Sequence, residues 1–177
     1  MSRFLSKASE SLLPYTPGEQ PQGRKFIKLN TNECPYPPSP KVAEAILAGY
    51  EENSSKIMPL ELANLRLYSD PEERVLIEAI ADHYGVETNQ VIAGNGSDEI
   101  LGFAFRAFCD QNAPLQFADL TYGFYPALCG LYGIPFKVVP LEEDFTLNIE
   151  PYKNCGNNVI IANPNAPTGM NLPLSAM

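Results

Sequence analysis

The sequence predicts an α/β fold built around a parallel β-sheet. Short strand-like runs alternate with helical patterns along the chain, which is the order that arises when helices connect parallel strands. The last of these runs, Asn158–Ala162, is almost continuously apolar, as expected for a parallel strand covered on both faces. The 177 residues, of which 45% are hydrophobic, are enough for one domain with a real core, or for one domain and part of a second.

Charge and cysteine content restrict the possible partners. The formal net charge is −9, whereas a nucleic-acid-binding protein needs a basic face. No apolar run is long enough to span a membrane, and Met1–Lys7 lacks the apolar core of a secretory signal. The four cysteines are widely spaced and His83 is the only histidine, so we expect a cytoplasmic protein with reduced thiols and no metal site.

The first part of the chain is predicted to be extended. Residues 1–24 are polar and proline-containing, which favours an arm, and Phe26–Asn30 could form a short strand. The proline-rich loop that follows, residues 31–40, is rigid and presents Asn32 and Tyr36 at low entropic cost. The alternative is a linker in which Tyr36 only packs.

Two helices are predicted next. Ser39 and Pro40 begin the first by the cap and first-turn rule, with Val42, Ala45, Ile46 and Tyr50 on its apolar face. In the second helix, Asp70 is the predicted N-cap, Pro71 the first helical residue and Glu73 the capping-box partner. This helix should run to about Tyr84 and end at Gly85, with an inward face made of Val75, Leu76, Ala79, Ile80 and His83.

The segment Val91–Ile100 indicates a strand, a glycine turn and the start of a helix. Val91–Ala93 can enter a sheet, Gly94 and Gly96 permit a tight turn, and Gly96 or Ser97 can cap the helix. Such a turn leaves backbone N–H groups unpaired, which makes it a possible anion site. A plain capped turn is an equally good interpretation of this stretch alone. The spacing matches neither a Walker loop nor GxGxxG.

The remaining elements continue the alternation. Strands are predicted at Leu115–Ala118 and Phe136–Val139, with a helix between them that opens at residues 121–125 and ends at Gly133. The last strand leads into the loop Asn163–Gly169. Loops at the carboxyl ends of parallel strands meet at one edge of a sheet, so we expect the loops at residues 94–97, 121–122 and 163–169 to gather into a ligand site.

In sequence and in order, these loops resemble those of the fold-type I, pyridoxal-phosphate-dependent aminotransferases, and within them the histidinol-phosphate aminotransferase branch. The resembling stretches are Leu29–Pro40, Leu67–Pro71, Ala93–Leu101, Arg106–Phe108, Asp119–Tyr125 and Asn163–Gly169. The resemblance implies a cytoplasmic homodimer that uses pyridoxal 5'-phosphate to exchange an amino group between L-histidinol phosphate and 2-oxoglutarate. It also implies a truncated parallel-sheet large domain at residues 51–177, preceded by an arm and part of the small domain at residues 1–50.

The resemblance also implies roles for individual residues. The turn of Gly96, Ser97 and Asp98 would cup the cofactor phosphate, in agreement with the anion-site argument, and Tyr122 would stack on the pyridine ring. Tyr68 would reach the cofactor phosphate of the partner subunit. Two residues of the proline-rich loop would bind substrate, Tyr36 at the phosphate end and Asn32 near it.

Three departures from the family pattern stand out. Ala166 occupies the position of the asparagine that bonds the cofactor's phenolic oxygen, and the adjacent Asn165 should point the other way. Cys34 and Pro37 replace the usual residues of the substrate-side loop. No lysine, Lys137 and Lys153 included, lies in the motif of the lysine that bonds the cofactor, so we expect an N-terminal portion without that residue.

Other functions are compatible with these motifs. The chain could belong to a related aminotransferase or to a threonine-phosphate decarboxylase on the same fold. It could also be a non-catalytic module that binds phosphate or assembles with a separate C-terminal half, or simply an α/β domain with ordinary capped turns.

Overall fold

The computed structural model describes residues 12, 23, 27, 29, 33–44 and 68–177. The chain divides into two compact units, one made of Met1–Thr16 and Gly94–Met177, and the other of Pro17–Ala93. Nearly all of the predicted arm lies outside the described residues, as do three of the five residues of the predicted strand Phe26–Asn30, and Asn32. Ile27 and Leu29 are described, and both are exposed and outside any strand.

The unit that contains residues 94–177 is built on a three-stranded parallel sheet with the order β2-β1-β3. The strands are β1 Leu115–Ala118, β2 Phe136–Val139 and β3 Asn158–Val159. The predicted α/β class is confirmed, and β1 and β2 span the predicted residues. β3 is shorter than predicted. The Ile160 N–H still bonds the Gln116 carbonyl, but Ile161 and Ala162 lie beyond the strand.

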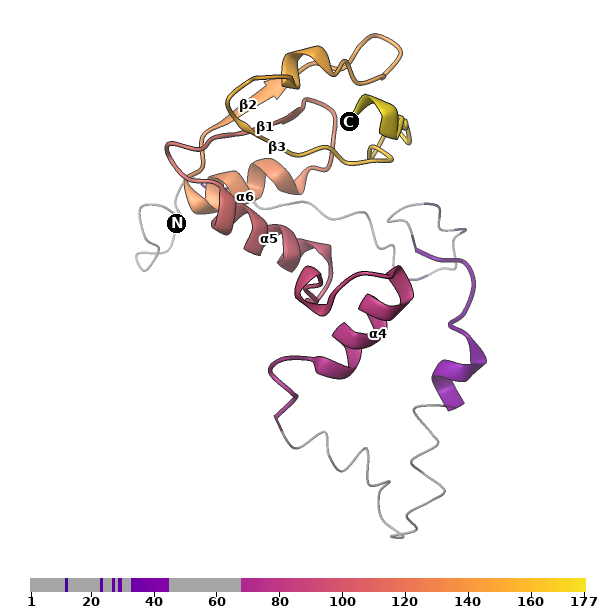
Figure 1. The fold of residues 1–177 in the computed structure, drawn as a ribbon. Helices are drawn as coiled ribbons and strands as arrows, with labels where there is room; N and C mark the ends of the chain where they lie inside the picture. Colours follow the sequence, from indigo (N-terminus) through magenta and orange to yellow (C-terminus); the bar gives the residue numbers. More distant parts are fainter. Residues whose placement is uncertain (1–11, 13–22, 24–26, 28, 30–32, 45–67) are drawn as a thin grey trace, which may run out of the picture. The chain divides into compact units, whose positions relative to one another are not determined.

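Two helices pack on one side of this sheet, α5 Ser97–Phe108 and α6 Phe124–Tyr132 (Figure 1). Apolar residues from both helices and from the central strand form the core: Phe105, Leu115, Phe117, Tyr125, Leu128, Cys129 and Ile134. The Tyr125 ring lies 6.0 Å from Phe105 and 5.7 Å from Phe117, so one aromatic residue connects α5, α6 and β1. Helix α6 ends at Gly133 in the left-handed conformation, as predicted.

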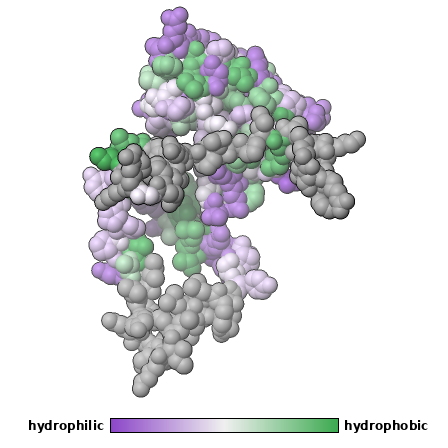
Figure 2. Space-filling view, turned by 180° about the vertical axis from the view of Figure 1, so that it is seen from behind, coloured by the Kyte–Doolittle hydropathy of each residue, from purple (hydrophilic) through white to green (hydrophobic). Residues whose placement is uncertain are grey.

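Short 3₁₀ helices complete the described part of this unit, η2 at Glu150–Tyr152 and η3 at Leu174–Ala176. The buried amide of Gln116 on β1 is satisfied locally, since its nitrogen donates to the Pro151 carbonyl and its oxygen accepts from Asn157. Hydrophobic and hydrophilic residues are interspersed over the face seen in Figure 2. Among the exposed apolar side chains are Phe136 and Val138 of β2 and Val159 of β3, which lie on the two outer strands.

The other unit contains α4 Arg74–Tyr84 and η1 Thr88–Gln90. Gly85 ends α4 with a φ of 67°, and the N–H groups of Gly85 and Val86 bond the carbonyls of Asp82 and Ala81, which confirms the predicted glycine stop. In the described residues 33–44, Pro40 begins a helix and the Ser39 hydroxyl accepts from the Lys41 N–H at 3.4 Å, as the cap rule predicts.

The predicted start of α4 is wrong by three residues. Asp70 caps a turn rather than the helix, because its carboxylate accepts from the N–H groups of Glu72 and Arg74 while the Glu73 N–H bonds the Asp70 carbonyl. The hydrogen bond from the Glu72 N–H lowers the pKa of the Asp70 carboxyl most, and the bond from the Arg74 N–H lowers it further. The chain then passes through Glu73 at a φ of 49° before α4 begins at Arg74. A short turn therefore takes the place of the capping box.

Four of the five residues of the predicted inward face of α4 are exposed in this structure, and only Ile80 is half-buried. Val75 is 84% exposed and Leu76 51% exposed, His83 and Ala79 are exposed, and Ala81 is the only buried residue of the helix. The 3.6-residue period is real, but periodicity shows only which residues share a face. It does not show whether the chain itself covers that face.

The predicted strand Val91–Ala93 is not formed. These residues have no strand assignment, and Ile92 is 68% exposed. A strand requires a hydrogen-bonding neighbour, and among the described residues β1 pairs only with β2 and β3. The apolar run is therefore extended backbone that leads directly into the glycine turn.

We expect Phe105→Ala to lower the free energy of unfolding by about 3–5 kcal/mol, because Phe105 is 2% exposed at the centre of the core. Phe103 provides a matched control, since it lies on the same helix but is 49% exposed, and Phe103→Ala should cost about 1 kcal/mol or less. Urea unfolding of the full-length protein, meaning everything that its gene encodes, measures both. Equal losses would contradict the placement of the core.

We also expect the protein to lose stability at alkaline pH. Burial raises the pKa of the Cys129 thiol from its ordinary value of 9.0 to about 11, with a further contribution from Cys109. The folded state thus favours the neutral thiol. The stability that the folded state gains from this preference is complete below pH 9.0 and is lost as the pH rises towards 11. Urea unfolding across this range should show a shallower pH dependence for Cys129→Ala than for the wild type, and identical slopes would contradict the burial argument.

Candidate functional site

The start of α5 forms a concentrated set of backbone donors. Gly96, one of the two predicted caps, is the N-cap, with φ 83° and ψ 170°, and Ser97 is the first helical residue. No side chain caps this helix start, and within the described structure the N–H groups of Ser97, Asp98 and Glu99 have no acceptor. Residues 94–99 are all exposed. This combination of unpaired N–H groups and the positive end of a helix dipole suits an anion.

The turn before α5 depends on its two glycines. Gly96 adopts a positive φ that side chains disfavour. At Gly94, a Cβ atom would lie 2.8 Å from Ile100 Cδ1, which is closer than real Cβ contacts allow. The Glu99 carboxylate also accepts from the Asn95 N–H at 2.7 Å, so the turn is closed by its own helix.

A side-chain hydrogen bond connects this turn to the loop that follows β1. The Tyr122 hydroxyl donates to Asp98 Oδ1 at 2.7 Å, although the two residues are 24 positions apart in sequence. The Tyr122 ring is half-buried and meets the Tyr125 ring edge-on, with centroids 5.6 Å apart. Two of the residues predicted to bind a cofactor are therefore in direct contact.

A second set of hydrogen bonds connects the loops after β1 and β3. Asn165 is 7% exposed, and its amide nitrogen donates to the Leu120 carbonyl at 2.9 Å while its amide oxygen accepts from the Thr121 hydroxyl at 2.8 Å. Together with the Tyr122–Asp98 bond, these contacts confirm that the three predicted loops converge. The sequence argument missed the role of Asn165. The only signal for it was Thr168 three residues later, whose hydroxyl also accepts from the amide.

These bonds use both amide hydrogens of Asn165, which donate to the Leu120 carbonyl and to Thr168 Oγ1. The neighbouring Ala166 is half-buried and has no polar side chain. The loop at residues 163–169 thus acts as a clamp between strand ends.

An acidic group lies at the carboxyl end of β1. Asp119 Oδ1 accepts from the N–H groups of Leu120 at 2.7 Å and Leu141 at 3.0 Å, which fixes the first turn of both connecting loops. Tyr152 is 6% exposed, and burial together with the charge of Asp119 raises its pKa to about 12. Burial also raises the pKa of Tyr125, so both phenols stay neutral near this edge.

Two other predicted site residues, Tyr36 and Tyr68, come from the other unit, and Asn32 lies outside the described residues. Tyr68 is fully exposed, and Tyr36 is 78% exposed. Of the lysines that the structure describes, Lys137 lies on β2 and Lys153 pairs with Glu150 at 2.7 Å. No group of three potential metal ligands occurs in the described part of the chain, and none of its helices is long and apolar enough to cross a membrane.

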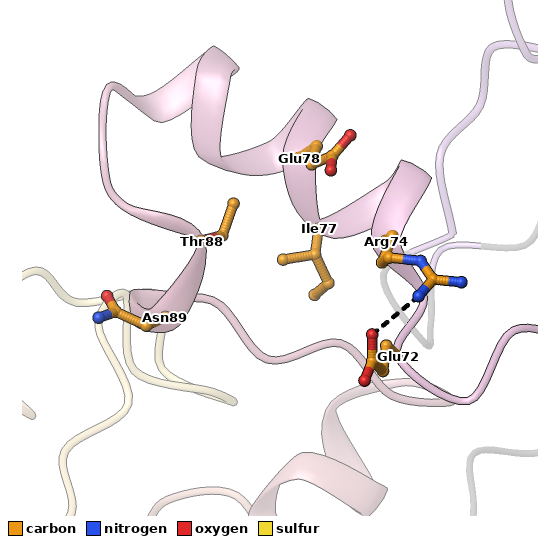
Figure 3. Close-up of a pocket in the computed structure, with 6 residues that line it drawn as sticks. All are labelled: Glu72, Arg74, Ile77, Glu78, Thr88 and Asn89. Atoms are coloured by element: carbon orange, nitrogen blue, oxygen red, sulfur yellow. Dashed lines mark hydrogen bonds and ion pairs between the residues drawn. The ribbon is translucent and has the colours of Figure 1, made fainter.

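A shallow pocket of about 270 Å³ lies between α4 and η1 (Figure 3). It is lined by Glu72, Arg74, Ile77, Glu78, Thr88 and Asn89, none of which is a predicted site residue. The one cation in it is already engaged, because Arg74 pairs with Glu72 at 3.0 Å and with Asp70 at 3.1 Å. This pocket is therefore a poor candidate for an anion site.

Comparison with known proteins identifies the family. The family model described as "Aminotransferase class I and II" matches residues 24–177. A histidinol-phosphate aminotransferase of Pseudomonas putida (strain W619) is 48% identical over the whole chain, which covers 48% of that protein. Histidinol-phosphate aminotransferase 1 of Methylococcus capsulatus (strain Bath) is 49% identical over 99% of the chain, which covers 46% of that protein.

A solved structure shows the same fold. The histidinol-phosphate aminotransferase of Sinorhizobium meliloti, in complex with pyridoxal-5'-phosphate, aligns with 94% of this chain and 44% of its own length, at a TM-score of 0.55 and 20% identity. The chain spans about half the length of the curated relatives that it matches. The match to the family model covers most of the 177 residues, and the chain belongs to the aminotransferase class I and II family.

Proposed function

We propose that this chain forms the phosphate-binding turn and the ring-stacking residue of a pyridoxal-5'-phosphate-dependent aminotransferase. The proposed reaction exchanges an amino group between L-histidinol phosphate and 2-oxoglutarate, a step of histidine biosynthesis. The observation that supports this most is the Tyr122–Asp98 hydrogen bond, because it places an aromatic ring beside a helix start with unpaired N–H groups. The identity of the relatives, 48% and 49%, supports the choice of substrate.

The residues present suit the cofactor's phosphate. A phosphate group needs several donors pointing at one place, and the N–H groups of Ser97, Asp98 and Glu99 are exposed and without acceptors in the described structure. The Ser97 hydroxyl adds a further donor at the same helix end. When bound, pyridoxal phosphate supplies the electron sink that amino-group exchange requires.

Each residue of the site then has a distinct task. Ser97 and Asp98 would bind and orient the phosphate through their backbone N–H groups, and Tyr122 would cover one side of the pyridine ring. Gly96, whose own N–H bonds the Gly94 carbonyl, would give the turn its shape. The hydrogen bonds of Asn165 to Leu120 and Thr121 fix the backbone from which Tyr122 projects. Ala166, at the position where the family has asparagine, offers no side-chain donor for the cofactor's phenolic oxygen.

The remaining assignments belong to the same proposal. Tyr36 and Asn32 would bind the substrate, and the exposed position of Tyr36 is compatible with that role. Tyr68, which is fully exposed, would reach the cofactor phosphate of a partner subunit in a homodimer. Residues 51–177 would belong to the large domain and residues 1–50 to the arm and small domain.

Steady-state kinetics on the full-length protein, meaning everything that its gene encodes, test this proposal. We expect histidinol phosphate to give the highest kcat/KM with 2-oxoglutarate as the amino acceptor. Histidinol is the matched control, since it lacks only the phosphate, and it should be a much poorer substrate. Efficient use of plain aromatic or aliphatic amino acids without use of histidinol phosphate would instead indicate a related aminotransferase. Carbon dioxide release from threonine phosphate would indicate a decarboxylase.

A further inference from the structure

We propose that Asp98 is a positioning residue, and that its carboxylate holds the Tyr122 ring at a fixed place relative to the phosphate-binding turn. This inference rests on the proposed function, because it assigns Asp98 a task in placing the ring that stacks on the cofactor. It concerns the Asp98 side chain, whereas the proposed function uses only the backbone N–H of this residue.

The contact itself is strong and specific. The Tyr122 hydroxyl donates to Asp98 Oδ1 at 2.7 Å, the length of a good O–H···O bond, and hydrogen bonds to carboxylates are stronger than those between neutral groups. Asp98 lies in the first turn of α5, so its acceptor atom is carried by the same helix end that presents the unpaired N–H groups. The ring and the turn are thereby connected by a single bond between side chains.

The rest of the Tyr122 environment restricts the ring in a complementary way. Its edge packs against Tyr125, which is 5% exposed and fixed in the core by Phe105 and Phe117. Its backbone is held from the preceding residues, because Asn165 bonds both the Leu120 carbonyl and the Thr121 hydroxyl. The Asp98 bond fixes the far end of the ring. A ring held at its base, edge and tip has little rotational freedom left to lose when a ligand binds.

Charge supports this assignment over a direct role of the Asp98 side chain in phosphate binding. A carboxylate beside an anion site repels a phosphate group, so the side chain opposes the function of the turn on which it lies. A favourable interaction with the helix dipole could also account for an acid here. The two explanations differ for Asp98→Asn, which keeps an acceptor oxygen but removes the charge. The positioning role would be retained in this variant, whereas the interaction with the helix dipole would be lost.

The experiment measures cofactor affinity, phosphate affinity and stability in the apo form of the full-length protein. The variants are Asp98→Ala, Asp98→Asn, Tyr122→Phe and the double variant Asp98→Ala with Tyr122→Phe. Glu99→Gln is the control for charge, because it removes the charge of the other acid of the first turn and leaves the phenol untouched. Glutamine also keeps an acceptor oxygen for the Asn95 N–H, so the turn stays closed. Pyridoxal phosphate affinity is measured by absorbance titration, inorganic phosphate affinity by calorimetry, and stability by urea unfolding.

We expect Asp98→Ala and Tyr122→Phe each to weaken pyridoxal phosphate binding by roughly tenfold, and the double variant to be no weaker than either. Asp98→Asn should restore most of the lost affinity. Inorganic phosphate should bind Asp98→Ala at least as well as the wild type, because the N–H groups remain. Urea unfolding of the wild type, Asp98→Ala, Tyr122→Phe and the double variant should show the same non-additivity.

Three results would overturn the proposal: additive losses in the double variant, equal losses for Asp98→Asn and Asp98→Ala, or a loss of inorganic phosphate affinity as large as the loss of cofactor affinity. A wild-type protein that binds no pyridoxal phosphate would overturn this inference and the proposed function together. A protein that binds the cofactor with the expected coupling but ignores histidinol phosphate would overturn only the substrate assignment.

Discussion

Residues 1–177 expressed alone are expected to show no measurable transamination of histidinol phosphate. The cofactor chemistry of this family needs a lysine that bonds the cofactor, and no lysine of this chain lies in the matching motif. Of the later lysines, Lys153 is paired with Glu150 at 2.7 Å and Lys137 projects from β2. The measurement is a coupled assay of 2-oxoglutarate-dependent turnover with this polypeptide at high concentration.

The control is the full-length protein under the same conditions, which should turn over. Binding of pyridoxal phosphate by the 177-residue polypeptide should be weak, through the Gly96–Asp98 turn and Tyr122. Borohydride treatment should therefore fix no more cofactor to it than the non-specific labelling of surface lysines that the urea-unfolded polypeptide shows. Turnover that saturates with histidinol phosphate would contradict the lysine argument.

The same polypeptide should be only marginally stable. A parallel sheet is favourable when both of its faces are covered, and here β2 leaves Phe136 and Val138 more than two-fifths exposed. Val159 on the other outer strand is 41% exposed, and the α4 residue Val75 is 84% exposed. Unpaired strand edges with apolar side chains favour association. Urea unfolding and sedimentation test this expectation, and a cooperative, monomeric fold of high stability would contradict it.

The elements that were predicted correctly are those that depend on a few consecutive residues. β1 and β2 are short apolar runs bounded by turn residues, and their bounds match the prediction. Gly85 and Gly133 end their helices because the left-handed conformation is intrinsically easy for glycine. The convergence of the loops that follow β1 and β3 was predicted from strand polarity, which a parallel sheet imposes wherever the strands pair.

The errors have two origins, namely partners that are distant in sequence and local patterns that are compatible with two structures. Val91–Ala93 has the composition of a strand, but composition cannot supply a neighbouring strand. The cap at Asp70 was misplaced because the same carboxylate pattern can close a turn or begin a helix, and the left-handed Glu73 selects the turn. The exposure of the apolar side chains of α4 was not predicted either, because an amphipathic pattern does not identify which residues cover the apolar face.

The candidate site shows the same division. Glycine spacing and the apolar pattern of α5 narrowed the N-cap to Gly96 or Ser97, because both are properties of one short segment, and the structure has Gly96. The bond between Tyr122 and Asp98, and the clamp at Asn165, connect segments 24 and 44–45 residues apart. A polar residue within a loop gives no sign of which of several possible partners it will bond, so these contacts required the fold.

Ser97→Pro is expected to weaken pyridoxal phosphate binding by roughly 10- to 100-fold, because it removes one backbone donor to an anion. Ser97 is the first residue of α5, the position at which proline is tolerated best, since the N–H group there has no intrahelical partner. The preceding residue is Gly96 with a ψ of 170°, which is compatible with the extended backbone that proline requires before it. The substitution should therefore delete a donor and leave the helix intact.

Ser97→Ala separates the two donors of this residue, because it removes the hydroxyl and keeps the N–H. If the backbone carries the phosphate, alanine should retain most of the affinity and proline should lose it. Absorbance titration of the apo full-length protein measures both, and urea unfolding shows whether α5 is intact in each variant. Equal losses for alanine and proline would assign the binding to the hydroxyl. Wild-type affinity in a correctly folded Ser97→Pro protein would mean that the phosphate lies elsewhere and that the start of α5 is an ordinary helix end.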